Sequence, residues 1–337
     1  MALLEVQNMT VLFHTEKGMN TAVDSLSFTL EAGETLGLVG ESGSGKSVTA
    51  LSIMRLLREP GEIAAGTVLY NGTDMLSLSN RQMQKYRGRE ISMIFQEPLS
   101  SLNPIQSIGQ QVMEPLFIHF RIGKLEAKER AIAMLKRVGI PDAEQRFDVY
   151  PHQLSGGLQQ RVMIALALVC EPKILIADEP TTALDVTIQA QILALLRKLQ
   201  AEFGMAIILI THDLGVIAEV AQNVCVMYAG EVVEFAAVDE IFDQTLHPYS
   251  AALINSIPNR EIEVERLPAV AGSIPGPEEK RQGCLFAKRC NFALPECSTM
   301  RQKIILAADG HKVACMRAKA GELPLNMVLP SVEQKHD

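Results

Sequence analysis

The residues best suited to chemistry form a glycine-rich octet, Gly40-Glu41-Ser42-Gly43-Ser44-Gly45-Lys46-Ser47. Glycines let the backbone curl so that successive N–H groups point at phosphate oxygens, and a following helix adds its positive N-terminal dipole. The octet lies between an apolar run, Thr35–Val39, and a helix-like run, Val48–Leu57, which is the context that a phosphate loop requires. We therefore expect Lys46 to contact the β and γ phosphates of a nucleotide and the Ser47 hydroxyl to be a ligand of Mg²⁺. The alternative is a flexible Gly/Ser turn.

Two adjacent acids end the apolar run Lys173–Ala177. Open α/β sheets bind their ligands at the carboxyl ends of strands, so Asp178 suits a Mg²⁺-coordinating carboxylate. Glu179 suits the group that polarises an attacking water, because a carboxylate near the γ-phosphate can accept a proton. The alternative is a solvated pair that caps the next helix.

A second glycine-containing motif stands at the start of a segment whose apolar residues have helical spacing. Ser155, Gly156 and Gly157 stand at its start, in the segment LSGGLQQR. A serine there can be a plain N-cap, or its hydroxyl and the free N–H groups can form a second anion site.

The six cysteines are unevenly distributed. Four of them follow the pattern Cys284-x5-Cys290-x6-Cys297-x17-Cys315, whereas Cys170 and Cys225 stand in apolar runs and are expected to be core residues. The spacing matches neither the common zinc modules nor the compact ferredoxin motif. A proline-rich segment of this size can bury little surface, so a metal ion bound by the four thiols would stabilise its fold.

Several apolar runs are expected to form the elements that carry these residues. Leu36–Val39, Ile91–Phe95, Ile174–Ala177 and Ile207–Ile210 are nearly continuous, as in strands covered on both faces of a largely parallel sheet. More open alternation predicts antiparallel edge strands at Leu3–Phe13 and Ser25–Leu30, and helical spacing predicts a helix over Leu125–Val138. Strand-like runs stop between Pro98 and Cys170, which predicts an inserted helical subdomain.

The sequence composition changes after Gln244, where prolines become frequent. His247-Pro248-Tyr249 and Ile274-Pro275-Gly276-Pro277 belong to a stretch in which proline disfavours long helices and central strands. We expect three regions: a nucleotide-binding domain at 1–245 with its helical part at about 98–170, a loop-rich appendage at 246–319, and a flexible tail at 320–337.

Composition excludes several classes of protein. The 337 residues are 47% hydrophobic and 21% charged, which excludes disordered and fibrous chains. The 31 basic and 39 acidic residues give a net charge of −8, which argues against a general nucleic-acid surface. Apolar runs fall far short of a membrane span, and the N-terminus lacks the features of a secretory signal.

The ordered motifs resemble the ATP-binding-cassette (ABC) ATPases. The resemblance rests on the phosphate loop, the LSGGLQQR signature, the ILIADE strand, Ala183-Leu184-Asp185, and the residues that follow two strands, Gln96 and His212. It implies an α/β P-loop NTPase with a mixed central sheet, an antiparallel edge subdomain and an inserted helical subdomain, followed by the small Pro/Cys-rich appendage.

The same resemblance implies roles for residues of this sequence. Catalytic roles would fall to Glu179, His212, Gln96 and Lys46, and Mg²⁺ would be held by Ser47, Gln96 and Asp178. Phe13 would stack on adenine, with Met19 or His14 as alternatives. The nucleotide would further contact, in this subunit or in the opposite one of a head-to-tail pair, Gly40, Ser42, Gly43, Ser44, Gly45, Val48, Ser155, Gly156, Gly157, Gln160 and Asp185.

Within that family the chain resembles the oligopeptide and dipeptide importer ATPases, through segments such as MIFQEPLSSLNP, ITHDLGVIAEVA and VMYAGEVVE. The resemblance implies ATP hydrolysis at the cytoplasmic face of the inner membrane. It also implies a second homologous ATPase as a heterodimer partner, two integral membrane permeases and, through them, an extracytoplasmic solute-binding protein. Nickel chelates, glutathione or another small solute are alternatives to peptides.

Members of that subfamily have a similar cysteine pattern and are thought to hold a [4Fe-4S] cluster, which the resemblance implies for Cys284, Cys290, Cys297 and Cys315. Zinc and unligated cysteines remain alternatives. Three other functions fit the sequence less well. A cassette acting on DNA or ribosomes disagrees with the single compact cassette and the acidic charge, an exporter ATPase disagrees with the cysteine-bearing tail, and a non-hydrolysing scaffold disagrees with the presence of Glu179, Gln96 and His212.

Overall fold

The structure, a computed structural model, describes residues 2–16, 18–96, 101–182, 184–257, 272–276, 282–308, 310–319, 321 and 323. The chain divides into two compact units. The first comprises Met1–Leu3, Leu30–Glu34 and Asp74–Ile210, and the second comprises Leu4–Thr29, Thr35–Thr73 and Thr211–Asp337. Within the described ranges, no helix is both long and apolar enough to cross a membrane.

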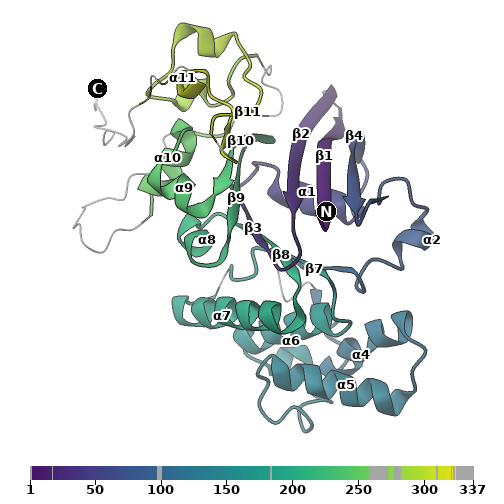
Figure 1. The fold of residues 1–337 in the computed structure, drawn as a ribbon. Helices are drawn as coiled ribbons and strands as arrows, with labels where there is room; N and C mark the ends of the chain where they lie inside the picture. Colours follow the sequence, from purple (N-terminus) through teal and green to yellow (C-terminus); the bar gives the residue numbers. More distant parts are fainter. Residues whose placement is uncertain are drawn as a thin grey trace. The chain divides into compact units, whose positions relative to one another are not determined.

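The first unit joins parallel strands to a group of helices (Figure 1). β6 pairs with β7 and β7 with β8, both in parallel. All residues of these strands are buried, which explains their nearly continuous apolar sequences. Its elements are α2 (Asn80–Met83), β6 (Ile91–Ile94), α4 (Ile108–His119), α5 (Lys124–Arg137), the 3-10 helix η1 (Pro151–Gln153), α6 (Gly156–Leu168), β7 (Ile174–Asp178), α7 (Val186–Phe203) and β8 (Ala206–Thr211).

The second unit contains an antiparallel sheet in which β1 lies between β2 and β4. Its other strands form a mixed array: β3 is parallel to β9, and β10 is antiparallel to both β9 and β12. Its elements up to residue 74 are β1 (Leu4–Thr15), β2 (Gly18–Leu30), β3 (Thr35–Val39), α1 (Lys46–Ile53), β4 (Gly61–Tyr70) and β5 (Thr73–Asp74). The later ones are α8 (Leu214–Val220), β9 (Asn223–Tyr228), β10 (Glu231–Ala237), α9 (Val238–Asp243), α10 (Pro248–Asn255), the 3-10 helices η2 (Ala287–Arg289) and η3 (Pro295–Ser298), β11 (Ile305–Leu306), β12 (Lys312–Val313) and α11 (Met316–Lys319).

The predicted elements are present, with shifted ends. The helix expected over Val48–Leu57 begins at Lys46 and ends at Ile53, because Arg55 adopts a positive φ of 51° that a helix cannot accommodate. The helix expected over Leu125–Val138 is α5, displaced by one residue. Between residues 101 and 170, the described elements are all helical, which confirms the helical insertion.

The C-terminal segment is more regular than its prolines predict. Pro248 stands at the first turn of α10, where its missing N–H costs no hydrogen bond. β12 adds to the edge of β10, with Glu234 opposite Val313, so this segment continues the strand array of the second unit. Residues 258–271 and nearly all of the expected tail lie outside the described residues.

Candidate functional site

The glycine-rich octet forms the turn between β3 and α1. Its first glycine, Gly40, has φ +152°, and a Cβ there would lie 2.2 Å from the Met227 carbonyl oxygen. Gly45 has φ +101°, and a Cβ there would lie 2.7 Å from the Ala22 carbonyl oxygen. Both positions therefore exclude side chains. The loop shape depends on these glycines, as the sequence predicts.

The polar groups of the loop suit an anion. Lys46 is only 5% exposed, and its Nζ donates to the carbonyl oxygens of Gly40 and Glu41 at 2.7 and 3.0 Å. Ser44 Oγ is buried without a hydrogen-bond partner among the described residues, whereas Ser42 and Gly43 are exposed. Ser47 follows in the first turn of α1. A buried ammonium group at a helix N-terminus, beside an unsatisfied hydroxyl, fits the phosphates of a nucleotide and their Mg²⁺.

A hollow of about 170 Å³ adjoins this loop. Gly43, Gly45 and Val48 line it, as expected for residues near a nucleotide. Two further segments line it that sequence reasoning missed, Asn20–Ala22 and Ile274–Gly276. The second carries no local signal, because only long-range folding brings it to the loop.

Phe13 is not among the residues that line the hollow. It is half-buried on β1 opposite Gly61, and its Cε1 lies 2.9 Å from where a Gly61 Cβ would be. Of the two alternatives, His14 pairs with Glu62 at 3.0 Å, and Met19 is 66% exposed. The adenine-stacking role of Phe13 therefore stays a prediction.

The two acids that end β7 differ in environment. Asp178 is 4% exposed, whereas Glu179 is half-buried and adopts a left-handed backbone with φ +46°. The Glu179 N–H donates to the Ile210 carbonyl oxygen at 2.9 Å, which fixes this conformation. A non-glycine residue in this region costs of order 1–3 kcal/mol and is typical of functional sites.

The structure brings Glu179 and Gln96 together. Gln96 Nε2 donates to Glu179 Oε2 at 3.1 Å, and Thr182 Oγ1 donates to the same oxygen at 2.7 Å. The Thr182 contact was missed, although the residue stands three positions after Glu179 in the motif DEPTTALD. The two donors orient the carboxylate and stabilise its charged form.

The signature residues lie at the start of α6. Ser155 is the exposed N-cap of this helix, and its hydroxyl makes no capping hydrogen bond. Gly156 is exposed and Gly157 half-buried. The hydroxyl and the first-turn N–H groups thus suit an anion at the protein surface. Gln160 differs: it is 2% exposed, and its Nε2 has no hydrogen-bond partner within the described ranges.

Two predicted site residues stand at other helix starts. Asp185 is the N-cap of α7 and accepts a hydrogen bond from Ile188 N–H at 2.9 Å, a structural role that its position before a helix could have revealed. His212 is exposed after β8, one residue before Asp213, which caps α8. Ala183 lies outside the described residues.

The four C-terminal cysteines line one narrow cavity of about 20 Å³. Burial raises the pKa of Cys284 to about 12 and that of Cys290 to about 11, and it also raises the pKa of Cys315. Backbone N–H groups of Phe286 and Phe292 act in the opposite direction on Cys284 and Cys290. These thiols are therefore protonated at neutral pH unless a cation displaces the proton.

In the part of the chain that the structure describes, the metal site that the sequence predicts is not shown. Among the residues that the structure describes, no group of three or more His, Cys, Asp or Glu side chains is arranged to hold a metal ion. The four cysteines line one cavity, but their side chains do not have the geometry of a ligand set. Cys170 and Cys225 are 7% and 0% exposed, which confirms them as core residues.

Comparison with known proteins identifies two regions. Residues 23–182 match the family "ABC transporter", and residues 233–297 match "Oligopeptide/dipeptide transporter, C-terminal region". A Brucella abortus protein named as a peptide import ATP-binding protein is 51% identical over 93% of this chain and 94% of the relative. The oligopeptide transport ATP-binding protein AppD of Bacillus subtilis is 50% identical (93% and 96%), and the dipeptide transport ATP-binding protein DppD of Escherichia coli is 47% identical (94% and 96%).

Solved structures agree with these relatives. The dimeric bacterial ABC transporter cassette MJ0796 is 30% identical, with a TM-score of 0.63 over 70% of this chain and 98% of that chain. The same cassette has also been solved in a post-hydrolysis state with ADP and Pi. The class of the protein follows from the phosphate loop, from the two acids at the end of β7 and from these matches. It is a nucleotide-hydrolysing P-loop ATPase.

More particularly, the chain belongs to the ATP-binding-cassette transporter ATPases, in the branch that carries the oligopeptide/dipeptide transporter C-terminal region.

Proposed function

We propose that this chain is the ATP-binding and ATP-hydrolysing subunit of a bacterial importer of dipeptides or oligopeptides. One observation carries the proposal: a phosphate loop and an oriented glutamate occur in the same chain as the C-terminal region of peptide transporters. The names of AppD and DppD support peptides as the solute. Nickel chelates and glutathione are the alternatives.

The phosphate loop supplies binding and charge stabilisation. Lys46 and the loop N–H groups hold the β and γ phosphates, and Gly40, Ser42, Gly43, Ser44, Gly45 and Val48 complete the contacts. Ser47, Asp178 and Gln96 hold Mg²⁺, which when bound neutralises charge that develops on the phosphates. Phe13 stacks on the adenine ring.

Glu179 orients the attacking water and accepts its proton. The hydrogen bonds from Gln96 and Thr182 to Glu179 Oε2 support this role, because they hold the carboxylate in one orientation. His212 contacts the γ-phosphate and stabilises the transition state.

We further propose that two cassettes close head to tail on ATP. The exposed Ser155 hydroxyl, which is not used as a helix cap, supports a contact with phosphate bound to a partner ATPase. Gly156, Gly157 and Asp185 lie near that seam. The Gln160 side chain is buried, so it contributes to the seam through packing, or it contacts the nucleotide only after its surroundings rearrange. The partner is a second homologous ATPase, so the pair is a heterodimer.

Two integral membrane permeases bind the helical subdomain, which places the chain peripherally at the cytoplasmic face of the inner membrane. An open groove of about 380 Å³ on α4 supports this proposal, because Phe117 and Ile118 are 45% and 67% exposed there. An extracytoplasmic solute-binding protein delivers the solute to the permeases.

The cysteine cavity holds a [4Fe-4S] cluster, with zinc as the alternative. Four thiols on one cavity and backbone N–H groups directed at two of the sulfurs support a thiolate-bound group. Protein purified without oxygen should then be brown, and Cys290→Ser should bleach it. Colourless protein with one zinc per chain would favour zinc, and colourless, metal-free protein would contradict both.

These assignments divide the chain into a nucleotide-binding domain at 1–245, an appendage at 246–319 and a tail at 320–337. Reconstitution tests the function: liposomes that contain the permeases and both ATPases, with the binding protein outside, should take up labelled dipeptide when ATP is inside. Uptake of a nickel chelate or glutathione, but not of peptides, would reassign the solute. ATP hydrolysis that is unaffected by permeases would contradict the importer proposal.

A further inference from the structure

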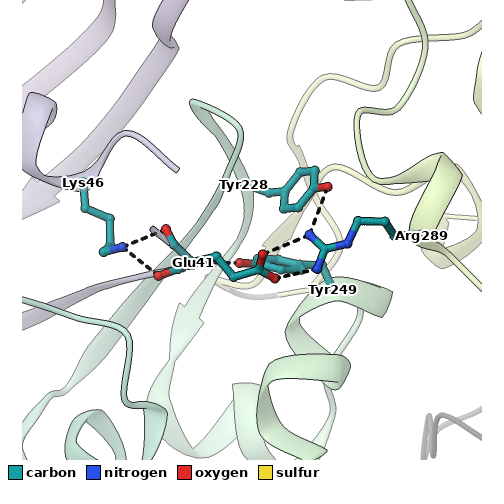
Figure 2. A network of polar contacts seen from close by, with 6 residues as sticks. Glu41, Lys46, Tyr228, Tyr249 and Arg289 are labelled. Atoms are coloured by element: carbon teal, nitrogen blue, oxygen red, sulfur yellow. Dashed lines mark hydrogen bonds and ion pairs between the residues drawn. The ribbon is translucent and has the colours of Figure 1, made fainter. Parts of the chain in front are cut away.

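One side chain of the C-terminal segment reaches the phosphate loop. Arg289 donates from Nη1 to Glu41 Oε2 and from Nη2 to Glu41 Oε1, each at 3.0 Å (Figure 2). The Arg289 side chain is 6% exposed and that of Glu41 28%, so the pair is partly shielded from solvent. A bidentate pair of this kind fixes orientation as well as distance.

The Glu41 carboxylate is a negative charge in a loop that suits phosphates. The backbone carbonyl oxygen of the same residue accepts from Lys46 Nζ at 3.0 Å, so the acid and the nucleotide-binding lysine meet at one residue. Figure 2 shows Lys46 and Arg289 reaching Glu41 from opposite sides. An unpaired carboxylate here would repel the phosphates and attract the Lys46 ammonium group, and both effects would weaken nucleotide binding.

Arg289 is held where it can compensate this charge. Its guanidinium lies 5.6 Å from the Tyr228 ring centroid and 5.9 Å from that of Phe286, and Nη1 also donates to the Tyr228 hydroxyl at 3.3 Å. Burial disfavours the charge of Arg289, but the hydrogen bonds to Glu41 and Tyr228 outweigh this effect and raise its pKa. The guanidinium is therefore charged where it meets Glu41.

The residues around the pair also hold the loop backbone. The Glu41 N–H donates to the Tyr249 hydroxyl at 2.9 Å. The Tyr249 ring packs against Tyr228 and Phe286, with ring centroids 4.7 and 5.3 Å away. Leu285, next to Phe286, lines the hollow beside the loop. Residues distant from the octet in sequence thus hold Glu41 both at its N–H and at its carboxylate.

We propose that Arg289 is a positioning residue of the nucleotide site: it holds the Glu41 carboxylate and compensates its charge, so that this acid does not oppose the phosphates. The inference rests on the proposed nucleotide site. It depends on neither the transported solute nor the contents of the cysteine cavity. It assigns a part in nucleotide binding to one residue of the region that matches the C-terminal region of peptide transporters.

The test is calorimetric titration of the full chain with Mg²⁺ and a non-hydrolysable ATP analogue. Arg289→Gln leaves the carboxylate uncompensated, so the analogue should bind about tenfold more weakly, the order expected of one charge near a protein surface. Glu41→Gln removes the carboxylate and should bind the analogue at least as tightly as the wild type. The double variant carries neither charge and should recover at least about half of the lost binding free energy.

A merely structural role of the pair predicts a different pattern. Loss of either partner would then weaken binding, and the double variant would bind no better than Arg289→Gln. Arg289→Lys keeps the charge, so it should bind the analogue more tightly than Arg289→Gln does. Arg301 offers a matched control, because it ties the same segment to Asp24 and Glu231, which lie outside the octet. Arg301→Ala should keep the affinity of the wild type.

Any of five results would overturn the inference: unchanged affinity in Arg289→Gln, weaker binding by Glu41→Gln than by the wild type, a double variant or Arg289→Lys no tighter than Arg289→Gln, or a loss in Arg301→Ala as large as that in Arg289→Gln. Failure of the proposed function is distinguishable from these, because the wild type itself would then bind no nucleotide. That result would overturn the inference as well.

Discussion

Acidification should destabilise this protein through one buried histidine, His247. The residue is 1% exposed, caps α10 and accepts the Tyr249 N–H on Nδ1 at 3.0 Å. Burial lowers its pKa from 6.5 to about 4, and the nearby Glu234 only partly opposes this shift. Glu234 is itself occupied, because it accepts hydrogen bonds from the backbone N–H groups of Leu246 and His247 and contacts His311 Nε2 at 2.8 Å.

The sign and size of the effect follow from these two pKa values. Above pH 6.5 the imidazole is neutral in both the folded and the unfolded chain, and its contribution to stability is complete. As the pH falls, the unfolded chain binds the proton first, so the free energy of unfolding decreases until the folded histidine also titrates near pH 4. The loss amounts to about 2 kcal/mol at pH 5 and about 3 kcal/mol at pH 4.

The assay is urea unfolding of the full chain between pH 7.5 and pH 4. His247→Asn is the matched variant, because asparagine keeps a helix N-cap but does not titrate. Subtraction of the two curves cancels the contributions of Glu234, His311 and the other groups common to both proteins. A difference in unfolding free energy that stays constant to within about 0.5 kcal/mol across this range would refute the argument.

Three further substitutions test other contacts. Gly40→Ala should abolish nucleotide binding measured with a fluorescent ATP analogue while the cysteine cavity stays intact, because the new Cβ would lie 2.2 Å from a carbonyl oxygen; normal binding would contradict the loop geometry. Thr182→Val should slow ATP hydrolysis about tenfold without weakening ATP binding, since Glu179 Oε2 loses the hydrogen bond from the Thr182 hydroxyl; an unchanged turnover number would remove Thr182 from this role. Ile118→Asp should weaken co-purification with the permeases by about tenfold, whereas Leu306→Asp, at a similarly exposed site on β11, should not; equal effects would place the docking surface elsewhere.

Local signals were sufficient to predict the nucleotide-binding features. The phosphate loop is contiguous, and its glycines, lysine and flanking runs all lie within 23 residues, Thr35–Leu57. The buried strands were found because residues covered on both faces must all be apolar. The pairing of Gln96 with Glu179 required the family resemblance, since 83 residues separate the two side chains.

Contacts made by the C-terminal segment could not be predicted in this way. Glu41 and Arg289 are 248 positions apart, and neither stands in a pattern that points to the other. β12 has two residues, too few to show the alternation of a strand, so its pairing with β10 left no sequence signal. The density of prolines disfavours a helix near Pro248, yet α10 begins at this residue because proline is favourable in the first turn of a helix.

The central claim is that the loop at Gly40–Ser47 binds MgATP and that Glu179 directs its hydrolysis. The most direct measurement is Mg²⁺-dependent phosphate release by the complex assembled with its partner ATPase and permeases, together with ATP binding, for the wild type and for Glu179→Gln. The account predicts that the variant loses about 10²–10⁴ in turnover and keeps its ATP affinity. Near-normal hydrolysis by the variant, or no Mg²⁺-dependent hydrolysis by the wild-type complex, would contradict it.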